Sequence, residues 1–136
     1  MHSIETDDVL FTILNGSSAI KTAITGGIYV AGERPDNSEL EDIVINTISL
    51  NHESPQSGAS NVNIHVPDLS LKVRNQQQRK TDRERLRTLT NLVLQELNAA
   101  RVSGLTIQVV SDTVIKEPAI NQSYMNIRVN WNIAIR

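Results

Sequence analysis

The clearest pattern of apolar and polar positions lies in the second half of the chain and is helical. Apolar residues recur every three or four positions from Leu86 to Ala100, which predicts one buried stripe along a helix. Thr81 and Glu84 match a capping box, in which each side chain satisfies a backbone N–H at the helix start. We therefore expect a long helix that begins at Thr81 and ends before Ser103-Gly104.

Two shorter helices are predicted near the N-terminus. Apolar residues at helical spacing over 9–14 follow Asp7-Asp8, acids that suit a helix start. Gly16 is then expected as a C-cap in the left-handed conformation, which glycine adopts without a Cβ penalty. Ser17 or Ser18 can cap a second helix, which Gly26-Gly27 should end.

The middle of the chain alternates in the manner of a β-hairpin. β-branched residues favour a strand over Ile43–Leu50, and strict alternation of apolar and polar positions favours another over Val62–Val66. Asn51–Ser60, between them, consists of turn-forming residues, so we expect a long exposed loop there. Ile28–Val30 is a candidate short strand, followed by a polar loop over Gly32–Leu40.

Further strands are predicted toward the C-terminus. One strand spans Leu105–Ile115 and another Met125–Ile135, joined by a turn around Pro118, and Leu69–Val73 can continue the preceding strand beyond a bend. The last strand is apolar on one side and polar on the other, which is typical of an antiparallel sheet with one buried face. The order of elements predicts a single α+β domain over residues 1–136. We expect an antiparallel sheet of about four strands, one long helix packed on a face, and short N-terminal helices.

Composition narrows the class of protein. The chain has 136 residues, of which 39% are hydrophobic and 21% charged, as in globular domains. It has no cysteine, which excludes a disulfide scaffold, thiolate metal sites and a cysteine nucleophile. The N-terminus is acidic, unlike a signal peptide, and no apolar stretch approaches the roughly 20 residues that cross a bilayer. We therefore expect synthesis in the cytoplasm and no membrane partner.

Sequence motifs for catalysis are missing. The chain lacks the P-loop, dinucleotide-binding, HExxH and GxSxG patterns. His2, His52 and His65 lack the regular close spacing of zinc ligands, and we expect them at the surface. Five acids that could be imagined as catalytic pairs are expected in a helix start or a solvated loop: Asp7, Asp8, Glu39, Glu41 and Asp42. The sequence thus predicts no enzyme, no cofactor, no metal site and no small-molecule substrate.

The distribution of charge is more informative than the net charge of −2. Residues 1–71 carry 10 acids and 2 bases, whereas residues 72–87 carry 7 bases and 2 acids. Six cations of the basic segment are candidate interface or lumen residues: Arg74, Arg79, Lys80, Arg83, Arg85 and Arg87. Unlike patches on one protomer suit a head-to-tail contact between copies. An arginine-rich segment can also bind the phosphates of nucleic acid, or be a solvated helix start. These three interpretations stay open.

Two of the predicted strands share a polar outer face, which consists largely of asparagines: Asn61, Asn63, Asn126, Asn130 and Asn132. Neutral amide side chains form hydrogen bonds equally well with water and with a polar partner surface. The sequence does not choose between solvent and a subunit interface for this face.

With its elements in this order, the chain resembles the tail terminator family of long-tailed bacteriophages, also described as tail-completion or head–tail joining proteins. The resemblance covers nearly all of the chain, and diffuse features rather than an invariant signature carry it. These features are the helix–break–helix–strand opening at Leu10–Tyr29, the Glu33–Pro35 loop before the strand at Ile43–Ser49, the strand at Asn61–Asp68 before the main helix at Thr81–Ala100, and the paired terminal strands with Trp131.

The resemblance implies a structural function. Members of the family assemble as a ring, usually of six copies, that stops growth of the tail tube and joins the tail to the neck of the capsid. DNA passes through the lumen without being read. The expected partners are further copies of the chain, the tail tube protein and a neck or head-completion protein. The expected location is the virion, and no catalytic residue is carried over.

The resemblance transfers regions rather than single residues. It implies that the Asn51–Ser60 loop contacts a partner, with four candidate residues: His52, Glu53, Gln56 and Ser57. It also implies that the basic start of the main helix lies at the ring interface or the lumen. The Arg74–Lys80 segment departs from many relatives and could meet a different neighbour. Two alternatives stay open: another neck or tail-tube component, and a small nucleic-acid-binding or regulatory domain that uses the arginines of residues 74–87.

Overall fold

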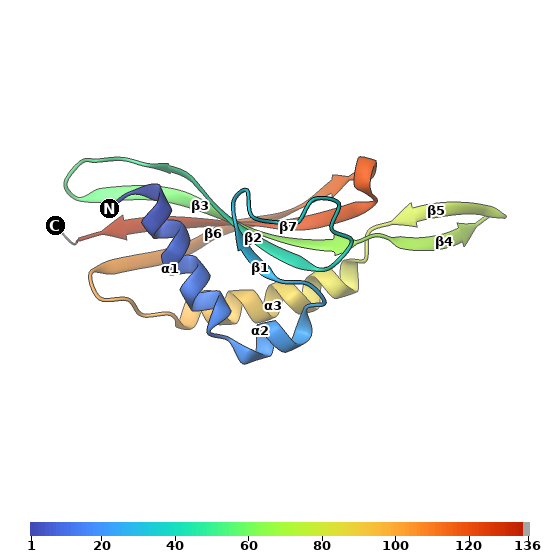
Figure 1. Cartoon of the computed structure of the whole chain (residues 1–136), viewed down its shortest axis with the longest axis horizontal. Helices are drawn as coiled ribbons and strands as arrows, with labels where there is room; N and C mark the ends of the chain where they lie inside the picture. The colour runs from blue at the N-terminus through green and yellow to red at the C-terminus, as the bar shows by residue number, and fades with distance from the viewer. Residues whose placement is uncertain (135–136) are drawn as a thin grey trace.

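Over residues 1–134, the protein is an α+β fold with three α-helices, a five-stranded sheet and a separate two-stranded hairpin (Figure 1). A computed structural model describes residues 1–134, so the predicted end of the last strand at Ile135 lies outside the described residues. The elements are α1 (Ser3–Asn15), α2 (Ser18–Ala23), β1 (Ile28–Val30), β2 (Asp42–Leu50), β3 (Gln56–Pro67), β4 (Leu69–Val73), β5 (Gln76–Lys80), α3 (Arg83–Ala99), β6 (Leu105–Glu117), a 3-10 turn η1 (Pro118–Ile120) and β7 (Gln122–Ile133).

The main sheet has the strand order β1-β2-β3-β7-β6. β1 pairs parallel to β2, and the other neighbours are antiparallel. α1 packs against β1 and β2, whereas α3 packs against β3, β7 and β6. The two long helices therefore lie toward opposite edges of the sheet.

The hydrophobic core fills the space between the helices and one face of the sheet. The predicted stripe of the main helix is confirmed, because Leu86, Leu89, Val93 and Leu97 are all buried. Alternate residues of the central strands meet this stripe, as the pattern of apolar positions predicts. The most buried of these strand residues are Ile43, Ile45, Val62, Ile64, Ile127 and Val129.

The expected count of about four strands is too low by one for the main sheet. The expectation of short N-terminal helices also needs correction, because α1 has 13 residues and begins at Ser3, before the predicted start at Asp7-Asp8. Gly16 is not left-handed but has φ of −76°. The reason is that Ser17 starts α2 at once, accepting a hydrogen bond from the Ile20 N–H. The chain therefore turns without the left-handed residue that a free helix end favours.

The N-cap of the main helix lies one residue later than predicted, and the helix begins at Arg83. Its N-cap is Asp82, whose Oδ1 accepts a hydrogen bond from the Arg85 N–H at 3.1 Å. The predicted cap, Thr81, instead places its hydroxyl 3.1 Å from that of Ser123 on β7. Asp and Thr are both good caps. Thr81 does not cap the helix because its hydroxyl contacts Ser123, 42 positions further along the chain.

The predicted ten-residue loop over Asn51–Ser60 is wrong, because β3 begins at Gln56. Residues 57–60 have low strand propensity, but all four pair with β7 and residues 58–60 also pair with β2. Gly58 fits here because a Cβ would lie 2.5 Å from the Ser49 carbonyl oxygen. The exposed connection shrinks to residues 51–55.

The Arg74–Lys80 segment forms the turn and second strand of the β4–β5 hairpin, which we call the arm (residues 69–80). Arg74 and Asn75 occupy the turn with φ of 51° and 62°. Positive φ at both turn residues is the conformation of a tight two-residue hairpin. Leu69–Val73 is therefore a strand, as expected, but it does not extend β3, because it belongs to another sheet. Figure 1 shows the arm projecting from the body at the end opposite both chain termini.

Candidate interaction surfaces

The arm is a two-faced hairpin with little of its surface covered. On one face, Leu69, Leu71 and Val73 have exposed fractions of 40%, 43% and 36%. On the other face, Ser70 pairs with Arg79 and Lys72 with Gln77. The arm carries four cations and no acid. An isolated two-stranded hairpin is only marginally stable in water, so this arm is suited to contact with another molecule.

The structure divides the predicted basic cluster into three groups. Arg74, Arg79 and Lys80 are exposed on the arm, and Arg83 and Arg87 are exposed on α3. Arg85 points inward instead. Its guanidinium donates hydrogen bonds to both carboxylate oxygens of Glu41, at 2.6 and 2.8 Å, and to the Ala23 carbonyl. The hydrogen bond with Glu41 raises the pKa of Arg85.

The expectation that Glu41 and Asp42 lie in a solvated loop is wrong, since both are buried. Asp42 accepts hydrogen bonds from Arg34 Nε at 2.8 Å, the Gly27 N–H at 2.9 Å and the Ser38 hydroxyl at 2.5 Å. Burial alone would raise the pKa of Asp42, but these hydrogen bonds outweigh it and hold the pKa below its usual value. The carboxylate thus anchors the polar loop between β1 and β2.

The expectation that all three histidines lie at the surface is wrong for His65. Its side chain is 11% exposed and packs against Tyr124, with ring centroids 4.9 Å apart. Burial and the nearby charge of Arg34 lower the pKa of His65 to about 4. Its Nδ1 lies 3.5 Å from a Glu117 carboxylate oxygen. His65 is therefore a neutral packing residue at pH 7.

The other two histidines, His2 and His52, lie near each other, with ring centroids 5.8 Å apart. Within residues 1–134, no group of three histidine or acidic side chains is placed to hold a metal ion. The four candidates of the predicted loop do not form one surface. His52, Glu53 and Ser57 are exposed, whereas the buried amide of Gln56 donates to the carbonyls of Met1 and Asn51.

On the polar outer face of the sheet, some side chains form hydrogen bonds with one another. Asn126 donates a hydrogen bond to Asn63 at 2.7 Å, and Arg128 donates one to Asn61 at 3.2 Å. Asn130 and Asn132 are exposed further along β7. The asparagines near the chain ends are therefore the most exposed of this set, whereas Asn61, Asn63 and Asn126 are half-buried.

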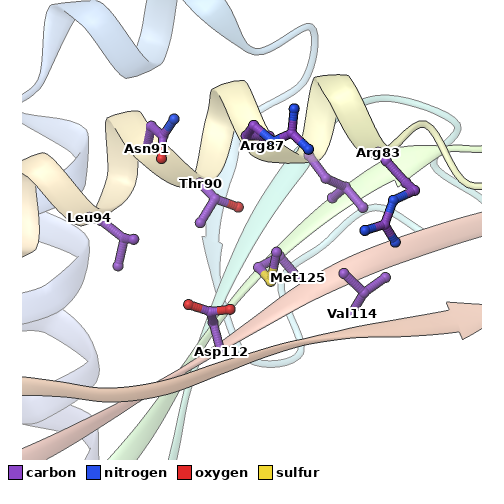
Figure 2. Close-up of a pocket in the computed structure, with 9 residues that line it drawn as sticks. Arg83, Arg87, Thr90, Asn91, Leu94, Asp112, Val114 and Met125 are labelled. Carbon is purple, nitrogen blue, oxygen red and sulfur yellow. The ribbon is translucent and has the colours of Figure 1, made fainter.

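A groove between α3 and the strands β6 and β7 was not predicted from the sequence (Figure 2). It has a volume of about 250 Å³, and its lining residues are Arg83, Leu86, Arg87, Thr90, Asn91, Leu94, Asp112, Val114 and Met125. Figure 2 shows Thr90 and Leu94 directed from the helix toward the strands, with Asp112 and Val114 on the facing wall. No sequence signal marks this groove, because its lining comes from three separate elements, α3, β6 and β7.

The edge strand β6 contributes one wall of the groove. Its one neighbouring strand within residues 1–134 is β7, and a β-bulge interrupts its register between Val109 and Ser111. Val110 and Val114 are 44% and 40% exposed. An edge strand with exposed apolar residues favours contact with another chain.

None of the helices over residues 1–134 is both long and apolar enough to cross a membrane. A comparison with protein-family models gave no match, and a comparison with curated proteins gave none either. Membership in the tail terminator family therefore stays a prediction.

Proposed function

We propose that the protein is a structural subunit of a phage virion. In this proposal it forms a ring that terminates the tail tube and joins it to the neck, with DNA passing through the lumen. The observation that carries the proposal is the arm, which exposes three apolar side chains and four cations at one end of the molecule. Such a hairpin gains stability only when a neighbour covers its apolar face.

The distribution of ionisable groups supports a structural rather than a catalytic role. The groups with the clearest pKa shifts are Asp42, His65 and Arg85. Each of them makes close contacts with other side chains of its own chain. Catalytic groups with perturbed pKa values instead converge on a pocket that a substrate can enter.

The two ends of the molecule offer separate contact regions for two partners. The arm lies at one end, and the loop over residues 51–55, with His52 and Glu53, lies at the other (Figure 1). A protein that joins a tube to a connector needs contacts at both ends of its long axis. In the proposal, one end contacts the tail tube protein and the other contacts the neck protein.

A second candidate function is nucleic-acid binding through the arm. The exposed cations Arg74, Arg79 and Lys80 favour it, because a projecting basic hairpin can reach phosphates. The four aromatic residues of the chain are too few for a base-stacking surface. Binding of this kind would therefore be independent of sequence and would weaken steeply with salt.

The test is a tube-capping assay with the purified protein and a self-assembling tail tube protein of the same phage. We expect the protein to bind tube ends and to stop elongation at substoichiometric amounts. The arm variant Leu71→Lys/Val73→Lys should lose this effect, and Lys21→Glu, an exposed change on α2, should keep it. Tubes that elongate normally, together with salt-sensitive DNA binding at micromolar protein, would replace the proposal with the nucleic-acid alternative.

A further inference from the structure

We propose that the groove between α3 and β6 receives the N-terminal half of α1 from a second copy of this chain. The inference rests on the proposed ring and names the contact between neighbouring subunits. It follows from the groove, from the surface of α1 and from the charges on both.

The groove presents an apolar floor between charged walls. Leu86, Leu94, Val114 and Met125 contribute its apolar lining. Thr90 also lines it, but this residue is only 6% exposed and its hydroxyl oxygen is buried. The groove therefore offers an entering helix mainly apolar side chains, which favour an occupant with an exposed apolar side chain of its own.

The proposed occupant, α1, carries the most exposed of the large apolar side chains in the described chain. Ile4 is 72% exposed, and Asp8 lies one helical turn further along the same face. Glu5 is also exposed beside it. An exposed isoleucine followed by acids on the same helix is suited to insert into an apolar groove with a basic rim.

The charges of the two surfaces are complementary. Arg83 and Arg87 lie one turn apart on α3 at the rim of the groove, so they can face Glu5 and Asp8 of the neighbour. Carboxylate–guanidinium pairs are among the strongest hydrogen-bonded pairs in proteins. Asp112, on the opposite wall, can face the N-terminal turn of the docked helix, where the helix dipole favours negative charge.

The arm of a second copy is a less suitable occupant for the same groove. It would bring Lys72, Arg74, Arg79 and Lys80 toward Arg83 and Arg87, and it has no acid to compensate. Juxtaposed like charges suppress association. The apolar face of the arm is therefore left for contacts along the tail rather than around the ring.

The positions of the two surfaces suit a closed ring. α1 lies over β1 and β2, whereas the groove lies between α3 and the opposite edge strand, β6. A contact between two different surfaces of the same chain is heterologous and repeats from copy to copy. Such a contact generates a ring when its rotation closes.

Charge reversal tests the contact. We expect Glu5→Lys/Asp8→Lys and Arg83→Glu/Arg87→Glu each to lower the association constant at least about tenfold, because each places like charges together. An equimolar mixture of the two variants should assemble again, because every contact in an alternating ring is then either wild type or fully reversed. A single chain with all four substitutions should also assemble. Light scattering measures each species.

The matched control reverses two exposed cations outside both the groove and the arm, Lys21→Glu/Arg101→Glu, and should assemble like the wild type. Circular dichroism should show that every variant is folded. The inference is wrong if the control pair abolishes assembly, if the groove variants assemble like the wild type, or if mixing the two reversed variants restores nothing.

Cross-linking covers the case in which subunits associate only weakly. The chain has no cysteine, so Ile4→Cys/Val114→Cys carries only the two introduced thiols. A short bis-maleimide should then link this variant into a ladder of head-to-tail oligomers. The control is Ile4→Cys/Thr22→Cys, whose second cysteine lies on α2, and its ladder should be at least about tenfold weaker. Equal ladders would overturn the inference. If the protein forms a ring and caps tubes but fails both the charge-reversal and the cross-linking test, the proposed function stays and only the proposed contact is wrong. If the wild-type protein does not cap tubes, the proposed function itself is wrong.

Discussion

At the scale of single residues, the sequence-based prediction failed for charged groups that turned out to be buried. Glu41 and Asp42 follow a polar, turn-forming loop, and His65 occupies a polar position of an alternating strand, so local patterning placed all three in solvent. The partner of Glu41 comes from a remote position, since Arg85 lies 44 residues beyond it. Local periodicity cannot report such pairs, because the free energy that favours burial comes from contacts made only in the folded chain.

The ion pair between Arg85 and Glu41 gives the first prediction. Arg85→Met should lower the free energy of unfolding by about 1–3 kcal/mol, because the buried Glu41 carboxylate loses its main hydrogen-bond donor. Arg83→Met, on the exposed side of the same helix, should change it by less than about 0.5 kcal/mol. Urea denaturation measures both variants. Equal effects would show that the inward pair contributes nothing specific.

His65 gives a prediction on pH. Its pKa is about 4 in the folded protein, against 6.5 in the unfolded chain. Between these values the unfolded chain binds the proton and the folded protein does not. Stability is therefore fully present above pH 6.5 and falls as the pH decreases toward 4, by about 3 kcal/mol in total.

The His65→Gln variant removes this titrating group, so its free energy of unfolding should change less with pH between 6.5 and 4.5 than that of the wild type. The pKa of Asp42 is held below 3.8, so this carboxylate loses its contribution only at still lower pH. Urea denaturation at a series of pH values provides the measurement. A variant with the same slope as the wild type would assign the pH dependence to other groups.

At the scale of elements, periodic patterns predicted where the long helix and most strands lie. The stripe of α3 and the alternation of β3, β6 and β7 have direct counterparts in the structure. Elements without such a pattern were missed. Residues 58–60 join β3 because neighbouring strands pair with them on both sides, and β5 forms from glutamines because a tight turn returns the chain beside β4.

The arm gives a prediction at this scale, since β4 and β5 pair only with each other. Replacing residues 70–79 with an Asn-Gly turn should leave the free energy of unfolding within about 1 kcal/mol of the wild type, because shortening a surface connection changes loop entropy only slightly. The same change should abolish capping of tail tubes. Thermal denaturation and the capping assay separate these two effects. A large loss of stability would mean that the arm supports the body of the fold.

At the scale of the whole molecule, the contact surfaces divide between ends and edges. The arm and the loop over residues 51–55 lie at the two ends of the long axis (Figure 1). The acidic surface of α1 and the basic rim of the α3–β6 groove lie toward opposite edges of the sheet. This division matches a ring subunit that contacts its copies sideways and its tail partners endwise. The α3–β6 groove could not be predicted from the sequence, because its walls belong to three separate elements.

The most direct test of this account is the solution mass of the protein across concentration, with negative-stain images of the largest species. The account predicts a particle near six times the 15.1 kDa of one chain, with an open centre. The particle should form either in the protein alone or once tail tubes are added. A protein that stays monomeric at high concentration, and also in the presence of tubes, would contradict the account.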